Sequence, residues 1–131
     1  DNQGAMQDYN KVIELDPKDA DAYNNRGILK YNLGDNQGAM QDYNKAIELN
    51  PKHAYAYHNR GVLKYNLGDN QGAMQDYNKA IELDPKFARA YYNRGILKCG
   101  SWQKESGCLD FSKAGELGLM RAYEAIKEYC Q

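Results

Sequence analysis

The sequence has no long hydrophobic run and no excess of charge of either sign. A membrane-spanning helix needs about 18 consecutive apolar residues, and no stretch approaches that length. With 17 basic and 18 acidic residues the formal net charge is -1, so no overall positive field would attract a polyanion. These absences exclude a membrane span and disfavour nucleic-acid binding. The apolar fraction of 42% is high enough for the chain to fold.

Cysteine and histidine are also scarce. Cys99, Cys108 and Cys130 are spaced too widely for a metal-binding knuckle, and their odd number argues against a closed disulfide framework. We therefore interpret them as small buried hydrophobic residues. His53 and His58 are five residues apart, not the four that place two metal ligands on one helical face. No acidic pair or glycine-rich phosphate loop accompanies them, so we predict no catalytic residue, no metal site and no cofactor.

The few prolines reveal how the chain is organised, because they recur at a fixed spacing. Pro17, Pro51 and Pro85 are equally spaced along the chain. The segment DNQGAMQDYNK begins at residues 1, 35 and 69, at the same spacing as the prolines, and residues 1–34 differ from residues 35–68 at only six positions. The chain is therefore an array of repeats of constant length, and residues 1–34 make up one repeat length.

Within one repeat, the apolar residues indicate two amphipathic helices. The first carries its apolar stripe at Ala39, Met40, Tyr43, Ala46 and Ile47. Asp35 can cap its start, and Pro51 ends it, because the residue before a proline is pushed out of helical geometry. A second helix follows from about Ala54 to Leu67. Neither helix can bury its apolar face alone, so neighbouring hairpins must stack along an array that has no central core.

These residues resemble the tetratricopeptide repeat family. Its signature is matched by Tyr23, Gly27, Ala39, Tyr43 and Pro51, and one repeat later by Tyr57, Gly61, Ala73, Tyr77 and Pro85. The resemblance implies an all-α fold, a right-handed superhelical solenoid of antiparallel helix hairpins. We expect the array to occupy residues 1–118, with a half repeat at 1–18 and repeats at about 20–53, 54–87 and 88–118.

The two ends of the chain differ. After Gly118, apolar residues return at helical spacing, so we predict a capping helix over residues 119–131. The helix that opens the chain lacks a preceding partner, which would leave Met6, Tyr9 and Ile13 incompletely covered. We expect either a fragment of a longer array or a chain that pairs end to end. Because the chain does not begin with methionine, targeting cannot be judged, and a soluble, intracellular protein is the expectation.

A row of basic residues departs from the family pattern. Arg26, Arg60 and Arg94 stand where the family has leucine, and Asp8, Asp42, Asp76 and Asp110 recur at the same spacing on the other helix. A buried arginine needs partners for its five donors, so we favour structural pairing with these carboxylates. The alternative is a row that binds phosphate.

One face of the first helix in each hairpin is left free by packing, and in proteins of this family that face lines a concave groove that binds extended peptides. The predicted groove residues are Asp21, Asn24, Asn25, Tyr55, His58, Asn59, Arg89, Tyr92 and Asn93. The differences between the repeats gather on this face, although the alternative is that too few substitutions exist to show a pattern. Along the groove the charge changes from negative at Asp21 to positive at Arg89. Complementary charge favours a ligand that is basic at one end and acidic at the other.

One column of the groove does not vary. Asn25, Asn59 and Asn93 are equivalent positions in successive repeats, and a primary amide can pair with a peptide unit whatever the side chain of the ligand. We predict that this asparagine column holds a ligand backbone; the alternative is that each amide bonds a carbonyl of a neighbouring helix. Some chaperone-binding relatives clamp a terminal carboxylate, but Asn24 and Ile28 replace two of the required groups, so we do not expect that recognition here.

The predicted function is a non-enzymatic protein–protein interaction scaffold that binds a protein or peptide. The alternative is a structural module that self-assembles end to end, forming a homo-oligomer through its uncovered first helix. An enzyme would require a domain outside these residues.

Overall fold

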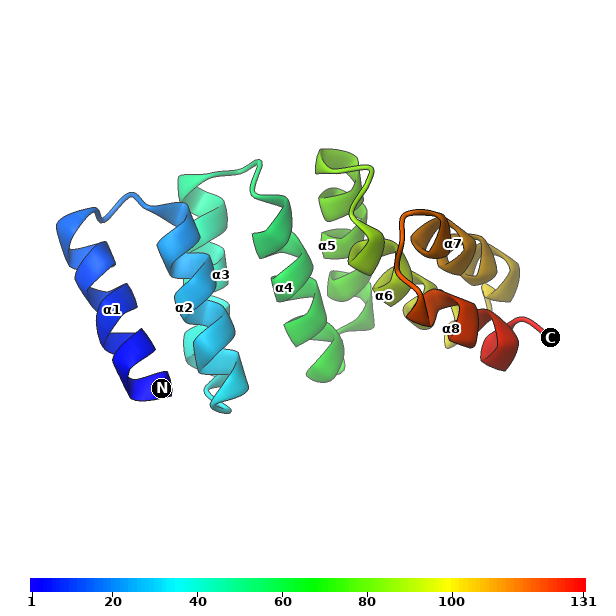
Figure 1. Ribbon diagram of the computed structural model, residues 1–131, viewed down its shortest axis with the longest axis horizontal. Helices are drawn as coiled ribbons and strands as arrows, with labels where there is room; N and C mark the ends of the chain where they lie inside the picture. The colour runs from blue at the N-terminus through cyan, green and yellow to red at the C-terminus, as the bar shows by residue number, and fades with distance from the viewer.

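The computed structural model describes all residues, 1–131, and is entirely helical (Figure 1). Its eight helices are α1 (Asn2–Leu15), α2 (Ala20–Asn32), α3 (Asn36–Leu49), α4 (Ala54–Asn66), α5 (Asn70–Leu83), α6 (Ala88–Cys99), α7 (Lys104–Glu116) and α8 (Arg121–Tyr129). The helices follow one another along one long axis, with the two termini at opposite ends (Figure 1). This arrangement confirms the predicted all-α solenoid of helix hairpins. No helix combines the length and the apolar character needed to cross a membrane.

Helix boundaries follow from local sequence. Asp35 and Asp69 cap α3 and α5, and each carboxylate accepts a hydrogen bond of 2.9 Å from the backbone N–H three residues on. The chain leaves α2, α4 and α7 through Gly34, Gly68 and Gly118, whose φ angles of +86°, +88° and +101° are disfavoured for residues with a Cβ. The repeated residues therefore set the ends of the helices before any tertiary packing is considered.

Within each hairpin, a glycine of one helix receives an aromatic ring of the next. A Cβ atom at Gly61 would lie 2.8 Å from Cε1 of Tyr77, which is closer than real side chains approach. The Tyr77 side chain is buried against this glycine, and Tyr43 meets Gly27 in the same way. In the third hairpin Phe111 replaces the tyrosine and packs on Gly95. Only glycine allows this approach, so the glycine–aromatic pair sets the distance between the two helices.

The arginine row is structural, as favoured from the sequence. Arg60 on α4 donates from Nε and Nη2 to the two carboxylate oxygens of Asp76 on α5, each at 2.8 Å. Its Nη1 donates to Oδ1 of Asn44 on α3 at 2.9 Å, and Nζ of Lys64 lies 3.2 Å from the same aspartate. The hydrogen bond to Asp76 raises the pKa of Arg60 above its ordinary value. One guanidinium thus joins three consecutive helices and uses three of its five N–H donors within the chain, which favours the structural role over phosphate binding.

The same arrangement recurs twice. Arg26 joins Asp42 and Asn10, and Arg94 joins Asp110 and Asn78. Asp8 on α1 occupies the same repeat position as the three buried aspartates but is exposed and forms no ion pair.

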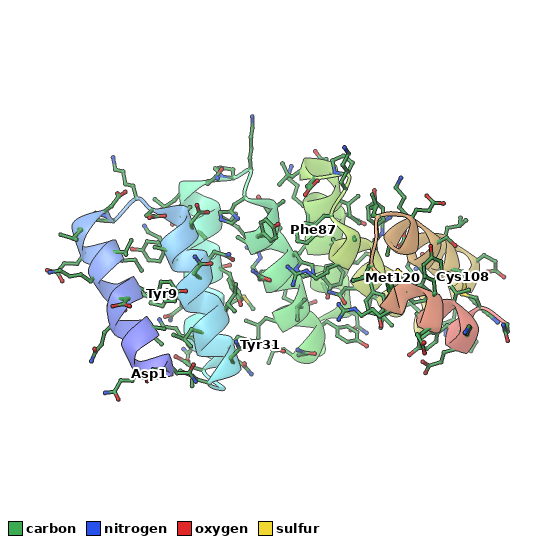
Figure 2. All side chains as sticks on the ribbon, viewed as in Figure 1. Asp1, Tyr9, Tyr31, Phe87, Cys108 and Met120 are labelled. Carbon is green, nitrogen blue, oxygen red and sulfur yellow. A yellow bond between two sulfur atoms is a disulfide. The ribbon has the colours of Figure 1, made fainter.

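The first and last helices differ in how far their side chains are buried. Helix α1 has no buried residue, and Met6, Tyr9 and Ile13 are half-buried. Figure 2 shows Tyr9 on this helix. Their incomplete cover agrees with the prediction. At the other end, α8 packs on α7 and buries Ala122 and Ala125.

The interpretation of the cysteines was wrong. Cys108 on α7 and Cys130 after α8 form a disulfide, and none of the three cysteines is fully buried. The odd count only requires that one cysteine stay unpaired, and that one is Cys99. Because the chain turns back at Gly118, α7 and α8 bring the two Cα atoms to 5.9 Å, although the residues are 22 apart in sequence.

The Arg60→Ala variant should unfold at lower denaturant concentration. Removing the guanidinium leaves the buried Asp76 carboxylate with only Lys64, and breaking such a pair costs about 3 kcal/mol of unfolding free energy. Chemical denaturation followed by circular dichroism measures this change. Lys79→Ala is the matched control, because it removes a cation from an exposed pair with Glu82 and should cost at most about 0.5 kcal/mol. Equal stability of the two variants would contradict the structural role of Arg60.

Candidate binding groove

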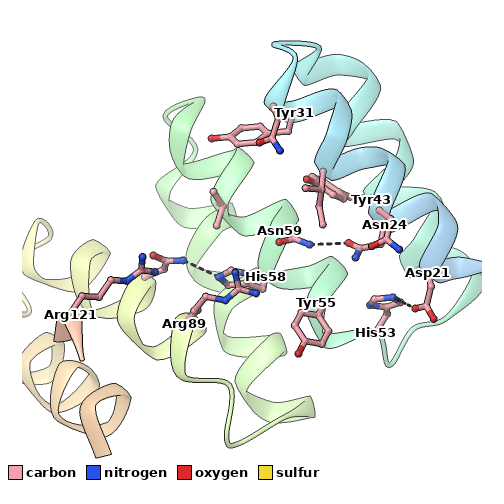
Figure 3. A pocket seen from close by; sticks show the side chains of 15 residues that line it. Asp21, Asn24, Tyr31, Tyr43, His53, Tyr55, His58, Asn59, Arg89 and Arg121 are labelled. Atoms are coloured by element: carbon pink, nitrogen blue, oxygen red, sulfur yellow. Dashed lines mark hydrogen bonds and ion pairs between the residues drawn. The ribbon is translucent and has the colours of Figure 1, made fainter. Parts of the chain in front are cut away.

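A groove of about 580 Å³ crosses the solenoid on the side of α2, α4 and α6 (Figure 3). Eight of the nine predicted site residues line it: Asp21, Asn24, Asn25, Tyr55, His58, Asn59, Arg89 and Asn93. Tyr92 does not line it, because its ring packs on Phe111 at a centroid distance of 5.7 Å. The structure therefore brings together residues from three successive repeats.

The groove is also lined by residues outside the nine named from the sequence. They are Ile28, Tyr31, Asn32, Tyr43, His53, Val62 and Arg121. Arg121 lies outside the recognisable repeats, but it follows Phe87 by one repeat length, and Phe87 follows His53 by the same interval. Extending the period past the point where the repeats diverge would have placed Arg121 at the entry of the groove, in the same slot as His53.

The asparagine column makes contacts along the groove. Nδ2 of Asn59 donates to Oδ1 of Asn24 at 3.0 Å, and Nδ2 of Asn93 lies 2.9 Å from Nε2 of His58. Both contacts join side chains on successive first helices of the hairpins, rather than a side chain and a backbone carbonyl. Asn25 at the start of the column is exposed. The donating amides, Asn59 and Asn93, each keep a second N–H and an oxygen for another partner.

Two of the predicted groove residues form its floor. Asn24 is 5% exposed and His58 is 4% exposed, so neither can contact a ligand over much of its surface. Among the groove positions that differ between repeats, Asp21, Tyr55 and Arg89 are exposed. The residues that differ between repeats therefore form two sets. The buried set shapes the groove, and the exposed set can contact a partner and determine which partner binds.

His58 is neutral at physiological pH. Its ring packs against Phe87 at a centroid distance of 4.8 Å, and burial together with the positive charge of Arg89 lowers its pKa to about 4. The Asn93 amide nitrogen can only donate, so Nε2 of His58 accepts and Nδ1 carries the proton. Nδ1 is buried without a hydrogen-bond partner. A charged imidazolium at this position would have to be desolvated beside a cation.

His53 has a different role at the acidic end. Its Nδ1 accepts a hydrogen bond of 3.1 Å from the backbone N–H of Ala56 and caps α4, where the preceding repeat uses Asp19. Because Nδ1 accepts, Nε2 carries the proton, and it donates to Oδ1 of Asp21 at 2.7 Å. His53 thus links the start of α4 to α2 and holds the carboxylate of Asp21 at the edge of the groove.

The two ends of the groove have opposite charge. Figure 3 shows Asp21 with His53 at one end and Arg89 with Arg121 at the other. The guanidinium of Arg121 lies 4.7 Å from the centre of the Tyr92 ring. The chain contains no group of three or more side chains placed to hold a metal ion. The groove is therefore lined by both polar and apolar side chains, with an aromatic side chain near its centre and opposite charges at its two ends.

The fold and the groove define a helical-repeat protein with an open inner face. Family models confirm this class and identify the family. A model described as TPR repeat matches residues 1–34 and 64–98, and two models described as tetratricopeptide repeat match residues 20–53 and 42–75. The chain belongs to the tetratricopeptide repeat family. A comparison with curated protein sequences gives no match.

Solved structures share the fold. MamA superposes with a TM-score of 0.82 at 25% identity, over 96% of this chain and 75% of that chain. MamA from residue 41 to its end, from Desulfovibrio magneticus RS-1, gives a TM-score of 0.76 at 26% identity, over 89% of this chain and 66% of that chain. The first TPR of Spaghetti (RPAP3), bound to the HSP90 peptide SRMEEVD, gives 0.80 at 22% identity, over 86% and 90% of the chains. At that identity the likeness concerns the fold alone.

His58 should make the protein less stable in mild acid. Because its pKa is about 4 in the folded chain and about 6.5 when unfolded, the unfolded state binds more protons between these values. The contribution to stability is complete above about pH 6.5 and is lost as the pH falls towards 4, by about 3 kcal/mol. Urea unfolding between pH 7 and pH 4 measures the loss, and His58→Gln should reduce the pH dependence by that amount. Identical pH profiles for the two proteins would contradict the assignment.

Proposed function

We propose that this chain is a non-enzymatic protein-interaction scaffold that binds an extended peptide segment in the groove. The main support is the distribution of differences between nearly identical repeats. The exposed groove position reads Asp21, Tyr55 and Arg89 in successive repeats, whereas the asparagine column beside it is constant. A constant column suits the backbone of a peptide, and the differing positions suit its side chains.

The asparagine column is well suited to hold a peptide backbone because it is already oriented. The buried side chains of Asn24 and His58 each fix one amide of the column through a hydrogen bond. An amide that is fixed before binding loses less conformational entropy when a ligand arrives. The remaining N–H and oxygen of Asn59 and Asn93 can then pair with peptide units of the ligand.

Tyr55 offers the central contact. Its side chain is 52% exposed, and its ring packs on the buried Phe87 at a centroid distance of 4.9 Å. Because Phe87 supports it, the Tyr55 ring stays exposed in the middle of the groove. An exposed amphipathic ring at this place suits an apolar or aromatic side chain of the ligand. A single aromatic anchor surrounded by polar groups is a common pattern in peptide recognition.

The comparisons give limited further support. Tetratricopeptide repeat proteins are generally interaction scaffolds without catalytic activity, and the first TPR of Spaghetti is solved with a bound peptide. A domain of this fold can therefore hold a peptide. In the division that we propose, the binding array covers residues 1–118 and residues 119–131 cap it.

Peptide binding should depend on Asn59. A peptide array identifies binding sequences, and the affinity of the strongest is then measured by calorimetry. Asn59→Ala removes the amide that would pair with the peptide backbone, so affinity should fall about five- to tenfold, the worth of one or two hydrogen bonds.

Gln75→Ala is the matched control, since Gln75 is an exposed amide on α5 outside the groove. It should bind as the unchanged protein does. An Asn59→Ala variant that keeps full affinity for every peptide from the array would count against this use of the groove.

The second candidate function is self-assembly through α1. On α1, Val12 and Leu15 are 39% and 73% exposed, and Tyr9 is only half-buried where its repeat equivalents Tyr43 and Tyr77 are buried. Docking of α1 onto the α8 end of another copy is not favoured, because α8 carries Glu128 and Tyr129 at the positions that hold Arg94 and Gly95 one repeat earlier. A symmetric contact between two α1 helices fits this surface better.

Sedimentation equilibrium without added peptide separates the two candidates. If α1 mediates assembly, the mean mass should rise from monomer to dimer with concentration, and Leu15→Lys should abolish the rise by placing a charge in the apolar contact. Gln41→Lys, on the exposed face of α3, is the control. A constant monomer mass up to millimolar concentration would leave only the peptide-binding function.

A further inference from the structure

The second helix of a hairpin binds two arginines, one from the first helix on each side of it. On α3, Asp42 binds Nε and Nη2 of Arg26 from α2, and Asn44 accepts a hydrogen bond from Nη1 of Arg60 on α4. Helix α5 repeats this arrangement with its own aspartate and asparagine. The aspartate thus pairs with the arginine of its own hairpin, and the asparagine pairs with the arginine of the next hairpin.

Helix α1 carries both of these acceptors but uses only one of them. Asn10 accepts a hydrogen bond of 2.9 Å from Nη1 of Arg26 on α2. Asp8, two residues earlier, is exposed and forms no ion pair. Its equivalents Asp42 and Asp76 are 4% and 3% exposed, and each is bonded to the arginine of its own hairpin. One carboxylate of the arginine network is therefore left without a cation.

Three other residues of α1 lie on the same side of the helix as Asp8 and also lack full cover. Ala5, Tyr9 and Val12 are half-buried or exposed, whereas their equivalents on α3 and α5 are at most 2% exposed. Figure 1 shows the reason, because α1 forms one end of the solenoid and has α2 on only one side. We call Ala5, Asp8, Tyr9 and Val12 the open face of α1.

We propose that the open face of α1 is a second binding site, for an amphipathic helix of another protein that carries Arg-Gly-x-x-Lys. This is the motif that Arg60, Gly61 and Lys64 form on α4. The arginine binds both carboxylate oxygens of Asp8 and the lysine adds a second cation, as the same groups of α4 do on α5. The glycine receives the ring of Tyr9. The site is separate from the groove and does not depend on peptide binding there.

The glycine of the motif follows from the tyrosine that it must meet. Gly27 on α2 and Gly61 on α4 each lie so close to a tyrosine ring that a Cβ atom would be 2.7 or 2.8 Å from it. A helix with a larger residue at this position would be held away from α1, and its arginine would lie farther from Asp8. The adjacent arginine and glycine therefore distinguish this partner from other amphipathic helices.

A second copy of this chain does not supply such a helix. Its helices with adjacent arginine and glycine are α2, α4 and α6, and each already binds the aspartate of its own hairpin. Helix α1 contains no arginine, so a contact between two α1 helices leaves Asp8 without a bidentate partner. The partner is therefore a different polypeptide.

The end of the array that α8 covers lacks both halves of this contact. Ser112 on α7 occupies the repeat position of Asn78 on α5, and Glu128 on α8 occupies the position of Arg94 on α6. The charge complementarity that would continue the array is thus absent at that end. At α1 it is present on the side of Asp8, which still requires a cation.

The test uses the full chain labelled with ¹⁵N and a peptide with the sequence of residues 52–68, which contains the motif of α4. An isolated helix of this length is marginal in water, so a lactam bridge stabilises it. The bridge replaces Tyr55 and Asn59, which line the groove in the intact chain and are not part of the motif. Two matched peptides carry Arg60→Gln or Gly61→Ala.

Binding of the unchanged peptide should shift the backbone signals of Asp8 and Val12. Arg60→Gln in the peptide should weaken binding at least about tenfold, because it removes the bidentate bond to Asp8. Gly61→Ala should weaken it at least about fivefold, although alanine favours helix formation more than glycine does. A contact that depended on amphipathic character alone would instead become tighter with alanine.

Asp8→Asn in the chain should weaken binding of the unchanged peptide at least about tenfold. It should leave the thermal melt of the chain unchanged, because Asp8 has no ion-pair partner there. Glu14→Gln is the matched control, since Glu14 is an exposed acid of α1 outside the open face. It should bind the peptide as the unchanged chain does.

Equal affinity of the three peptides would overturn the motif, and full affinity of Asp8→Asn would overturn the role of Asp8. Shifts of the Asn59 and Asn93 side-chain amides without shifts at Asp8 would place the helix in the groove and overturn the site on α1. A dimer of the chain that persists at saturating peptide would assign the open face to a second copy and also overturn the proposal. The absence of any shift at about 1 mM peptide would do the same.

Discussion

Each repeat is held to its neighbours by an arginine that three helices share. Arg60 on α4 binds both carboxylate oxygens of Asp76 on α5 and reaches back to Asn44 on α3. A bidentate bond of this kind has strict geometry, so it sets the angle between helices as well as their distance. Together with the contact between Gly61 and Tyr77, it leaves little freedom in how one hairpin meets the next. The regular succession of the hairpins follows from three copies of the same bond.

Because this packing is the same in every repeat, the side chains on the inner face can differ from one repeat to the next without disturbing the packing. Asp21, Tyr55 and Arg89 occupy equivalent places in the array, yet their chemistry changes from acidic to aromatic to basic. A repeat protein can therefore build a graded surface from one backbone unit. In this chain the series continues into α8, whose first residue, Arg121, also lines the groove.

The fold was predictable because its determinants are local and repeated. The constant repeat length, the capping aspartates and the glycines after the helices can all be recognised within one repeat or by comparing it with the next. The pairing of Arg60 with Asp76 was also predictable, since both recur at one spacing. The disulfide was not, because it depends on how α8 folds back on α7 after the repeat has diverged, and the cysteine count alone does not describe that turn.

The sequence by itself determined the class of the fold, the length of the repeat and the positions at which the repeats differ. Only the tertiary structure decided which groove residues a partner can reach. It buries Asn24 and His58 beneath the asparagine column, turns Tyr92 towards Phe111, and places Arg121 of α8 in the lining of the groove. The physical reason is that periodicity assigns a residue to a face of one helix, whereas its exposure depends on side chains that belong to the next repeat.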